Sequence, residues 1–150
     1  MYKTILVPLD GSKQAEAIFP YAENTALQYG AQIFFLWVMT QPLMLEWDEV
    51  VDLSRYHNEF ERRTQQAKDY LTACQQEFQK KGIKAHIRIA YGPVVKTILT
   101  VAEEIKADLI AMASHGWDNL RWRYNWSVTA SVLQRSDPPL LVVRTNGDVP

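Results

Sequence analysis

The chain has 150 residues, of which 47% are hydrophobic and 22% charged, and its formal net charge at pH 7 is −1. This composition is typical of one globular domain, and a single cysteine excludes a disulfide scaffold. The balanced charge does not indicate a nucleic-acid-binding protein, and no apolar run approaches the ~20 residues of a membrane span. The amino terminus leads straight into an apolar strand without a signal peptide, so we expect a cytoplasmic protein with no membrane association.

Short apolar runs alternate with segments of helical periodicity along the whole chain. The runs predict five strands, at residues 4–7 (ended by Pro8), 33–38, 85–90, 108–112 and 140–143. Four helices are predicted between them, at residues 12–28 (capped by Ser12, kinked at Pro20 and stopped by Gly30), from about 54 to 81, from 94, and from 127 (capped by Ser127). Residues 39–53 suggest a loop and a short helix, and the tail from Thr145 is expected to fray. Strands alternating with helices indicate one α/β domain built on a single open, mainly parallel sheet with helices on both faces.

The longest predicted helix has one apolar face. Its apolar positions recur at helical spacing, namely Tyr56, Phe60, Ala67, Leu71, Cys74 and Phe78, with Thr64 between them. This spacing predicts that Cys74 is a small buried side chain rather than a reactive thiol. The three histidines, His57, His86 and His115, lie on different elements with no metal-ligand spacing.

Two loops are candidates for a binding site, because open α/β sheets bind ligands beyond the carboxyl ends of their strands. The first loop, Pro8-Leu9-Asp10-Gly11-Ser12, follows the first strand. The second begins at Ala113-Ser114-His115-Gly116 and leads to Trp126-Ser127-Val128-Thr129. Glycine and a helix amino terminus let backbone amides approach a phosphate, so both loops suit an anionic ligand.

These segments resemble the universal stress protein family over nearly the whole chain. The resemblance is carried by Ile5-Leu6-Val7-Pro8-Leu9-Asp10-Gly11-Ser12, by Gly92-Pro93, by the stretch from Ala107 to Gly116, by Ser127-Val128-Thr129 and by Pro139 to Arg144. It implies an adenine nucleotide alpha hydrolase-like fold with strand order 3-2-1-4-5. It also implies a homodimer formed through the fifth strand.

The nucleotide-binding members of this family carry three spaced glycines followed by a hydroxyl residue. Here the spacing is intact: Ala113 stands at the first glycine position, Gly116 at the second, Trp126 at the third and Ser127 at the hydroxyl position. Trp126 is the more serious departure, because an indole there can fill the phosphate space or meet a positive φ that suits glycine. Arg121 and Arg123 offer replacement charge.

The resemblance implies a bound ATP or AMP, with Mg²⁺ if ATP binds. The residues that it assigns to the ligand are Pro8, Leu9, Asp10, Val38, Met112, Ala113, Gly116, Ser127 and Val128. Each has a structural alternative: Asp10 is a common turn residue, and Val38 and Met112 end buried strands. We read His115 as a structural loop residue rather than a catalytic one.

The segment from Trp117 to Trp126 holds three tryptophans and two arginines. It suits a protein partner, packing on its own domain or, as the weakest alternative, single-stranded nucleic acid. The overall hypothesis is a dimeric stress-response protein that binds adenine nucleotide. The alternative is an interaction module of the same fold that binds no nucleotide. No nucleophile–base pair is evident, so we assign no enzyme activity beyond, at most, a slow ATPase.

Overall fold

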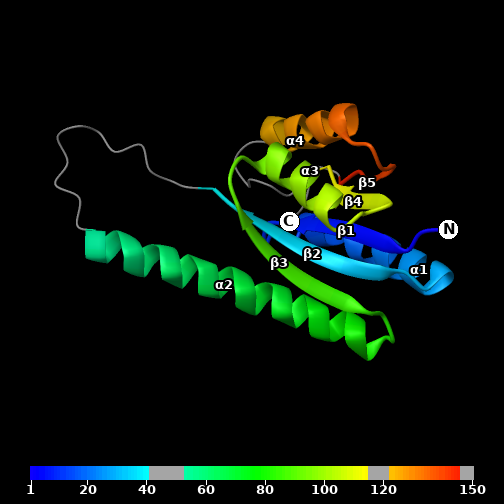
Figure 1. Cartoon of the computed structure of the whole chain (residues 1–150), viewed down its shortest axis with the longest axis horizontal. Coiled ribbons are helices and arrows are strands. Elements are labelled where there is room, and N and C mark those ends of the chain that lie inside the picture. Colours follow the sequence, from blue (N-terminus) through cyan, green and yellow to red (C-terminus); the bar gives the residue numbers. More distant parts are fainter. Residues whose placement is uncertain (41–52, 115–121, 146–150) are drawn as a thin grey trace.

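The structure is a computed structural model that describes residues 1–40, 53–114 and 122–145; the side chains of residues 53 and 122–127 are outside this description (Figure 1). The short helix expected within 39–53 and the frayed tail fall largely outside the described residues. The elements run in the order β1 (Thr4–Leu9), a 3₁₀ helix η1 (Ala15–Ile18), α1 (Phe19–Tyr29), β2 (Gln32–Met39), α2 (Leu53–Lys80), β3 (Ala85–Tyr91), α3 (Val94–Glu104), β4 (Leu109–Ala113), α4 (Trp122–Arg135) and β5 (Leu140–Val143).

The five strands form one sheet in the order β3-β2-β1-β4-β5, and each neighbouring pair is parallel. The fold class and the strand order expected from the resemblance are therefore confirmed. The chain first moves outward from β1 to β3 and then returns to the other side of β1 for β4 and β5. The order reverses between β1 and β4, and ligands of such sheets bind at this point.

The sheet separates two hydrophobic cores. Alternate residues of β1 illustrate this, because Ile5, Val7 and Leu9 pack with η1, α1 and α2, whereas Leu6 packs with α3 and α4. Figure 1 shows the same layers, with α3 and α4 on one face of the sheet and α1 and α2 on the other. All residues of β1 are buried, as expected for the central strand of a parallel sheet.

The predicted face of α2 is confirmed, but only part of it is covered by the sheet. Ala67, Leu71, Cys74 and Phe78 are buried. With 28 residues, α2 is about 42 Å long, whereas the 7 residues of β3 span about 23 Å. The amino-terminal turns of α2 therefore extend past the carboxyl end of β3 (Figure 1).

Two expectations about proline are corrected. Pro8 does not end the first strand, which continues to Leu9. Pro20 does not kink a continuous helix; it lies in the first turn of α1, after η1 has ended at Ile18. Proline is compatible with a first helical turn because the amide there has no partner within the helix. Gly30 ends α1 as expected, in the left-handed conformation with φ 65°.

Candidate functional site

The turn that follows β1 is closed by its own side chains. A carboxylate oxygen of Asp10 accepts a hydrogen bond from the Ser12 amide at 2.9 Å, and the Ser12 hydroxyl accepts one from the Ala15 amide at 3.1 Å. The Ser12 hydroxyl thus meets the first amide of η1, but the helix begins three residues later than predicted and its cap position is Gln14, which makes no side-chain cap bond. Gly11 lies between them with φ 84°, a left-handed conformation that favours glycine. Pro8 and Leu9 are buried beneath the turn and Asp10 is half-buried.

The carboxyl ends of β1 and β4 separate immediately before this turn. Thr4 accepts a hydrogen bond from the Asp108 amide, so the backbone groups of Thr4 and, by alternation, those of Leu6 and Pro8 face β4. Pro8 has no N–H to donate to β4. The ladder joins Ile5 to Leu109 and Leu6 to Ile110, whereas β1 stays paired with β2 up to Leu9. The sheet is thus open on the β4 side where the strand order reverses.

Three of the expected ligand residues lie at the ends of β2 and β4. Val38, Met112 and Ala113 are all buried, and the side chains of Val38 and Met112 belong to the core beneath α3 and α4. The side chains of Val38 and Met112 therefore pack in the core beside the open edge between β1 and β4. A ligand at this edge would meet their backbone groups, which is the contribution that the resemblance implies for Val38.

Four buried hydroxyls have no hydrogen-bond partner in the described chain, those of Tyr70, Ser114, Thr129 and Thr145. Two of them, Ser114 and Thr129, were not among the expected site residues and belong to the end of β4 and the helix that follows. Ser114, directly after β4, and Thr129, on α4, are each 1% exposed. Neither hydroxyl has a hydrogen-bond partner in the described part of the chain. Val128 and Val132 lie one residue before and three residues after Thr129 on α4, and they pack on the same core as Met112. The Thr129 side chain therefore faces the sheet. Buried hydroxyls without partners are rare and costly, which makes them candidates for contact with a bound group.

The expected role of Ser127 as a helix cap is wrong. The helix α4 begins at Trp122, so Ser127 and Val128 lie inside it. Their amides are in positions that bond to carbonyls one turn earlier, and the free amides are those of the first turn. Trp126 is also within the helix and therefore has right-handed backbone geometry rather than a positive φ. No glycine or proline between Trp122 and Ser127 prevents the earlier start.

Gly116 and His115 lie outside the described residues, as do Arg121 and the first part of the segment from Trp117 to Trp126. The expectations for this segment remain predictions. Within the described ranges, no group of three or more His, Cys, Asp or Glu side chains is placed to hold a metal ion. The same ranges contain no helix with the length and apolar character needed to cross a bilayer.

The thiol of Cys74 on α2 is buried in the core between the sheet, α1 and α2. Burial raises its pKa to about 11, so the thiol is protonated and unreactive at neutral pH. The expectation of a small buried side chain is confirmed.

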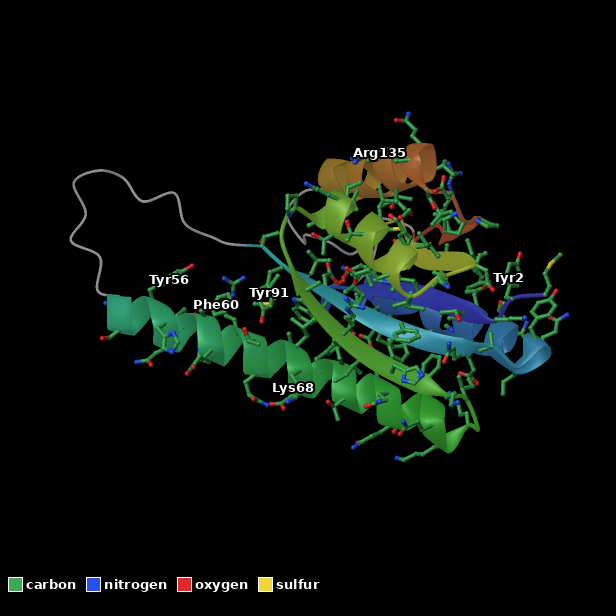
Figure 2. The ribbon with its side chains drawn as sticks, in the orientation of Figure 1. Tyr2, Tyr56, Phe60, Lys68, Tyr91 and Arg135 are labelled. Atoms are coloured by element: carbon green, nitrogen blue, oxygen red, sulfur yellow. The ribbon has the colours of Figure 1, made fainter. Side chains whose placement is uncertain are left out.

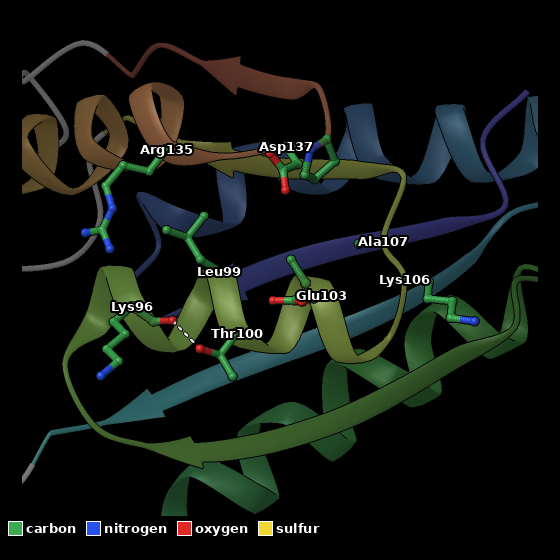
Figure 3. Close-up of a pocket in the computed structure, with 10 residues that line it drawn as sticks. Lys96, Leu99, Thr100, Glu103, Lys106, Ala107, Arg135 and Asp137 are labelled. Carbon is green, nitrogen blue, oxygen red and sulfur yellow. Dashed lines mark hydrogen bonds between the residues drawn. The ribbon is translucent and has the colours of Figure 1, made fainter.

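A groove of about 320 Å³ lies between α3 and the end of α4 (Figure 3). Its lining includes Lys96 and Glu103 of α3 and Lys106, two residues beyond that helix. Arg135 at the end of α4 and Asp137 in the turn that follows complete the charged lining. Lys106 and Asp137 precede β4 and β5, so the groove opens toward the amino ends of these strands. None of the expected ligand residues lines it, and its mixed charges favour neither an anion nor a cation.

Comparison with known proteins gives consistent relatives. Residues 1–144 match the model of the universal stress protein family. The chain is 30% identical to Universal stress protein MJ0577 of Methanocaldococcus jannaschii, over 96% of each protein. Among solved structures, that of MJ0577 superposes with a TM-score of 0.80 at 26% identity, covering 99% of each chain. Universal stress protein UspA from Lactobacillus plantarum gives a TM-score of 0.80 at 27% identity, covering 95% of this chain and 98% of that one.

Two more distant structures share the fold and contain nucleotides. A universal stress protein in complex with cAMP has a TM-score of 0.67 at 19% identity, covering 97% of this chain and 98% of that one. The universal stress protein from Archaeoglobus fulgidus in complex with dAMP has a TM-score of 0.62 at 18% identity, covering 94% and 97%. The family match over 1–144, the identity to MJ0577 and the shared strand order agree with one another. The chain belongs to the universal stress protein family.

Proposed function

We propose that this universal stress protein binds an adenine nucleotide, ATP or AMP, at the open edge between β1 and β4. The observation that carries the proposal is the pair of buried hydroxyls, Ser114 and Thr129, without partners in the described chain. Phosphate oxygens accept hydrogen bonds from hydroxyls, and a bond to a charged group stabilises by about 1.5–3 kcal/mol. The cAMP and dAMP complexes of two structural neighbours support the same ligand class.

In this proposal the end of β1 contacts the adenosine part of the nucleotide, and the end of β4 contacts its phosphates. The β1 turn, with Pro8, Leu9 and Asp10, meets the adenosine end together with the backbone at Val38 and the edge above Met112. Ala113, Gly116, Ser127 and Val128 border the phosphate end, next to Ser114 and Thr129. The amides of Ser127 and Val128 are in helical positions, so hydroxyl groups contribute more here than the expected helix amino terminus. Mg²⁺ accompanies the nucleotide when ATP is bound.

We also propose a cytoplasmic homodimer formed through β5. This strand is the edge of the sheet next to β4, and its four residues are only half-buried in the single chain. An apolar edge strand exposes unpaired backbone groups that favour pairing with another chain. A dimer that pairs or covers β5 removes this exposed edge.

Native mass spectrometry of freshly purified protein tests both proposals in one measurement. We expect a dimer that carries one adenine nucleotide per chain, and calorimetric titration of the stripped protein should show that ATP and AMP bind. A monomer at micromolar concentration contradicts the dimer. Absence of binding by ATP, AMP and cAMP, with and without Mg²⁺, contradicts the nucleotide site.

The alternative function is that of an interaction module, and one observation favours it. Tyr56 and Phe60 lie along the extended part of α2, where Tyr91 packs against Phe60 with a ring-centroid distance of 5.5 Å (Figure 2). Tyr91 is 51% exposed although it is aromatic. Exposed aromatic side chains are frequent in protein interfaces. Binding of a protein partner with no nucleotide bound, abolished by Tyr91→Ser, is the expected result under this alternative.

A further inference from the structure

The side chain of Trp37, near the end of β2, lies against the Asp10 turn. In the register of β1 and β2, Trp37 pairs with Leu9, the last residue before Asp10. A methyl group built on Gly11 would lie 2.7 Å from Cη2 and 2.9 Å from Cζ3 of the Trp37 ring. Carbon atoms do not approach this closely without displacement, so the indole is in direct contact with the backbone of the turn.

The ring of Trp37 is held in turn by α2. Tyr70 packs against it edge to face, with 5.6 Å between ring centroids. The Tyr70 hydroxyl is buried close to the Cys74 thiol without a well-formed hydrogen bond in the described chain, and the contact of Tyr70 with Trp37 is made by its aromatic ring. Tyr70 and Trp37 are both half-buried at the border of the core that contains Leu71 and Cys74.

The contact with Trp37 matters because it is made at Gly11, the residue of the turn with the most backbone freedom. Gly11 has φ 84°, and glycine loses more backbone freedom on folding than any other residue. The bond from the Ser12 amide to Asp10 is local and only part-buried. A large rigid ring against Gly11 excludes other positions of the turn and so limits where the Asp10 carboxylate can lie.

We propose that Trp37 is a positioning residue of the nucleotide site: its indole, held by Tyr70 of α2, fixes the Gly11 turn and thereby the place of Asp10. This inference rests on the proposed function for its effect on binding. It extends that function by making the adenosine end of the site depend on α2 through the packing of Tyr70 against Trp37. The contact between Trp37 and Gly11 can be tested without a ligand.

A double-mutant cycle between positions 11 and 37 measures the contact. Gly82 is a matched control, because it also has φ 84° but nothing within 4 Å of a methyl group built on it. Gly82→Ala should raise the equilibrium constant of unfolding about five- to thirty-fold, through backbone strain alone. Gly11→Ala should raise it at least about fivefold more, through the added collision with the indole. In a Trp37→Leu background the two glycine substitutions should have equal effects.

Hydrogen exchange tests the turn itself. In Trp37→Leu the Ser12 amide should exchange at least about tenfold faster than in the parent protein, while the Ala31 amide, bonded to Ala26 at the end of α1, keeps its rate. Trp37→Phe should restore much of the protection, because a ring remains over Gly11. Tyr70→Phe should leave the Ser12 amide unchanged, and Tyr70→Leu should have an effect smaller than that of Trp37→Leu. Equal acceleration of both amides would indicate general destabilisation and overturn the proposal.

Binding completes the test. Trp37→Leu should weaken adenosine binding at least about fivefold, with a smaller loss for Trp37→Phe. If the parent protein binds no adenine nucleotide, the proposed function fails, and the cycle and the exchange rates still decide whether Trp37 fixes the turn. If the parent binds and Trp37→Leu binds equally well with normal Ser12 exchange, the nucleotide site stands and the role of Trp37 is refuted.

Discussion

The two strand ends that border the open edge differ in how their polar groups are satisfied. After β1, Asp10 and Ser12 bond within their own turn, and the turn is covered by Trp37. After β4, the Ser114 hydroxyl is buried without a partner in the described chain, and so is that of Thr129 on the helix that follows. The side chains of Asp10 and Ser12 are bonded within the first turn, whereas Ser114 and Thr129 have no partner among the described residues and are placed for contact with a further group. Substitutions at the two ends should therefore change stability in opposite directions.

The largest effect should follow from removing both hydroxyls at the β4 end. In Ser114→Ala/Thr129→Val, ATP affinity should fall about tenfold for each hydroxyl, because each lost bond to a charged phosphate corresponds to at least about 1.4 kcal/mol. Adenosine affinity should not change. The unliganded double variant should be more stable than the parent by about 1 kcal/mol or more, since an unpartnered buried hydroxyl is replaced by an apolar group. Calorimetry and urea unfolding measure the two effects.

Thr4→Val is the matched control for this prediction. Thr4 is also buried, at 6% exposure. Unlike Ser114 and Thr129, its hydroxyl accepts a hydrogen bond from the Gln32 side-chain amide at 3.0 Å. Thr4→Val should therefore destabilise the protein by about 1–3 kcal/mol, because the Gln32 amide loses its partner. If the double variant is destabilised in the same way, Ser114 and Thr129 already have partners and the contrast between the strand ends disappears.

The next effect concerns Trp126, which stands at a glycine position of the nucleotide-binding relatives. Because Trp126 lies inside α4, Trp126→Ala removes the indole without the loss of about 1 kcal/mol that glycine causes in a helix interior. ATP affinity should rise about tenfold, while adenosine affinity stays nearly unchanged, since only ATP reaches the phosphate end. Identical affinities of the variant and the parent for both ligands would show that the indole does not block the phosphates.

At the β1 end, Asp10→Ala should lower both stability and binding. Loss of the bond to the Ser12 amide should cost about 0.5–1.5 kcal/mol without unfolding the domain, and adenosine and ATP should be weakened to the same extent. Asp69→Ala is the control, because Asp69 accepts an exposed helical bond from Gln65 and should lose about 0.5 kcal/mol or less with no change in binding. Unchanged adenosine affinity in Asp10→Ala would remove Asp10 from the site.

The smallest effect concerns the pH dependence of stability that the buried Cys74 thiol causes. Burial raises the pKa of Cys74 to about 11 from an ordinary value of 9.0, so the folded state holds the thiol proton more tightly than the unfolded state does. The resulting stability is complete below about pH 9 and is lost as the pH rises through 11. Urea unfolding between pH 8 and about 10.5 should show a smaller decline in Cys74→Ala than in the parent. Parallel declines would mean that the thiol is not desolvated.

Local sequence signals were sufficient for most of the backbone. The apolar runs located the strands, the spacing of Ala67, Leu71, Cys74 and Phe78 gave the buried face of α2, and Gly30 marked the end of α1. The wrong predictions concern residue types that are compatible with more than one local structure. Pro8 lacks an amide, but the strand continues because that missing donor faces the place where β1 and β4 separate. Ser127 is a favoured cap, yet nothing before it stops the helix from starting at Trp122.

The sequence by itself determined the α/β class, the two loops proposed to carry the site and the family resemblance, because these depend on periodicity, turn residues and motif spacing. Only the tertiary structure decided which polar groups are satisfied. The Asp108 carboxylate binds the amides of Lys3 and Thr4 across more than a hundred residues, and Trp37 covers Gly11 from another strand. The same holds for Ser114 and Thr129, which look ordinary in the sequence. Their significance arises from burial without a partner among the described residues, which depends on how distant segments pack and not on any local pattern.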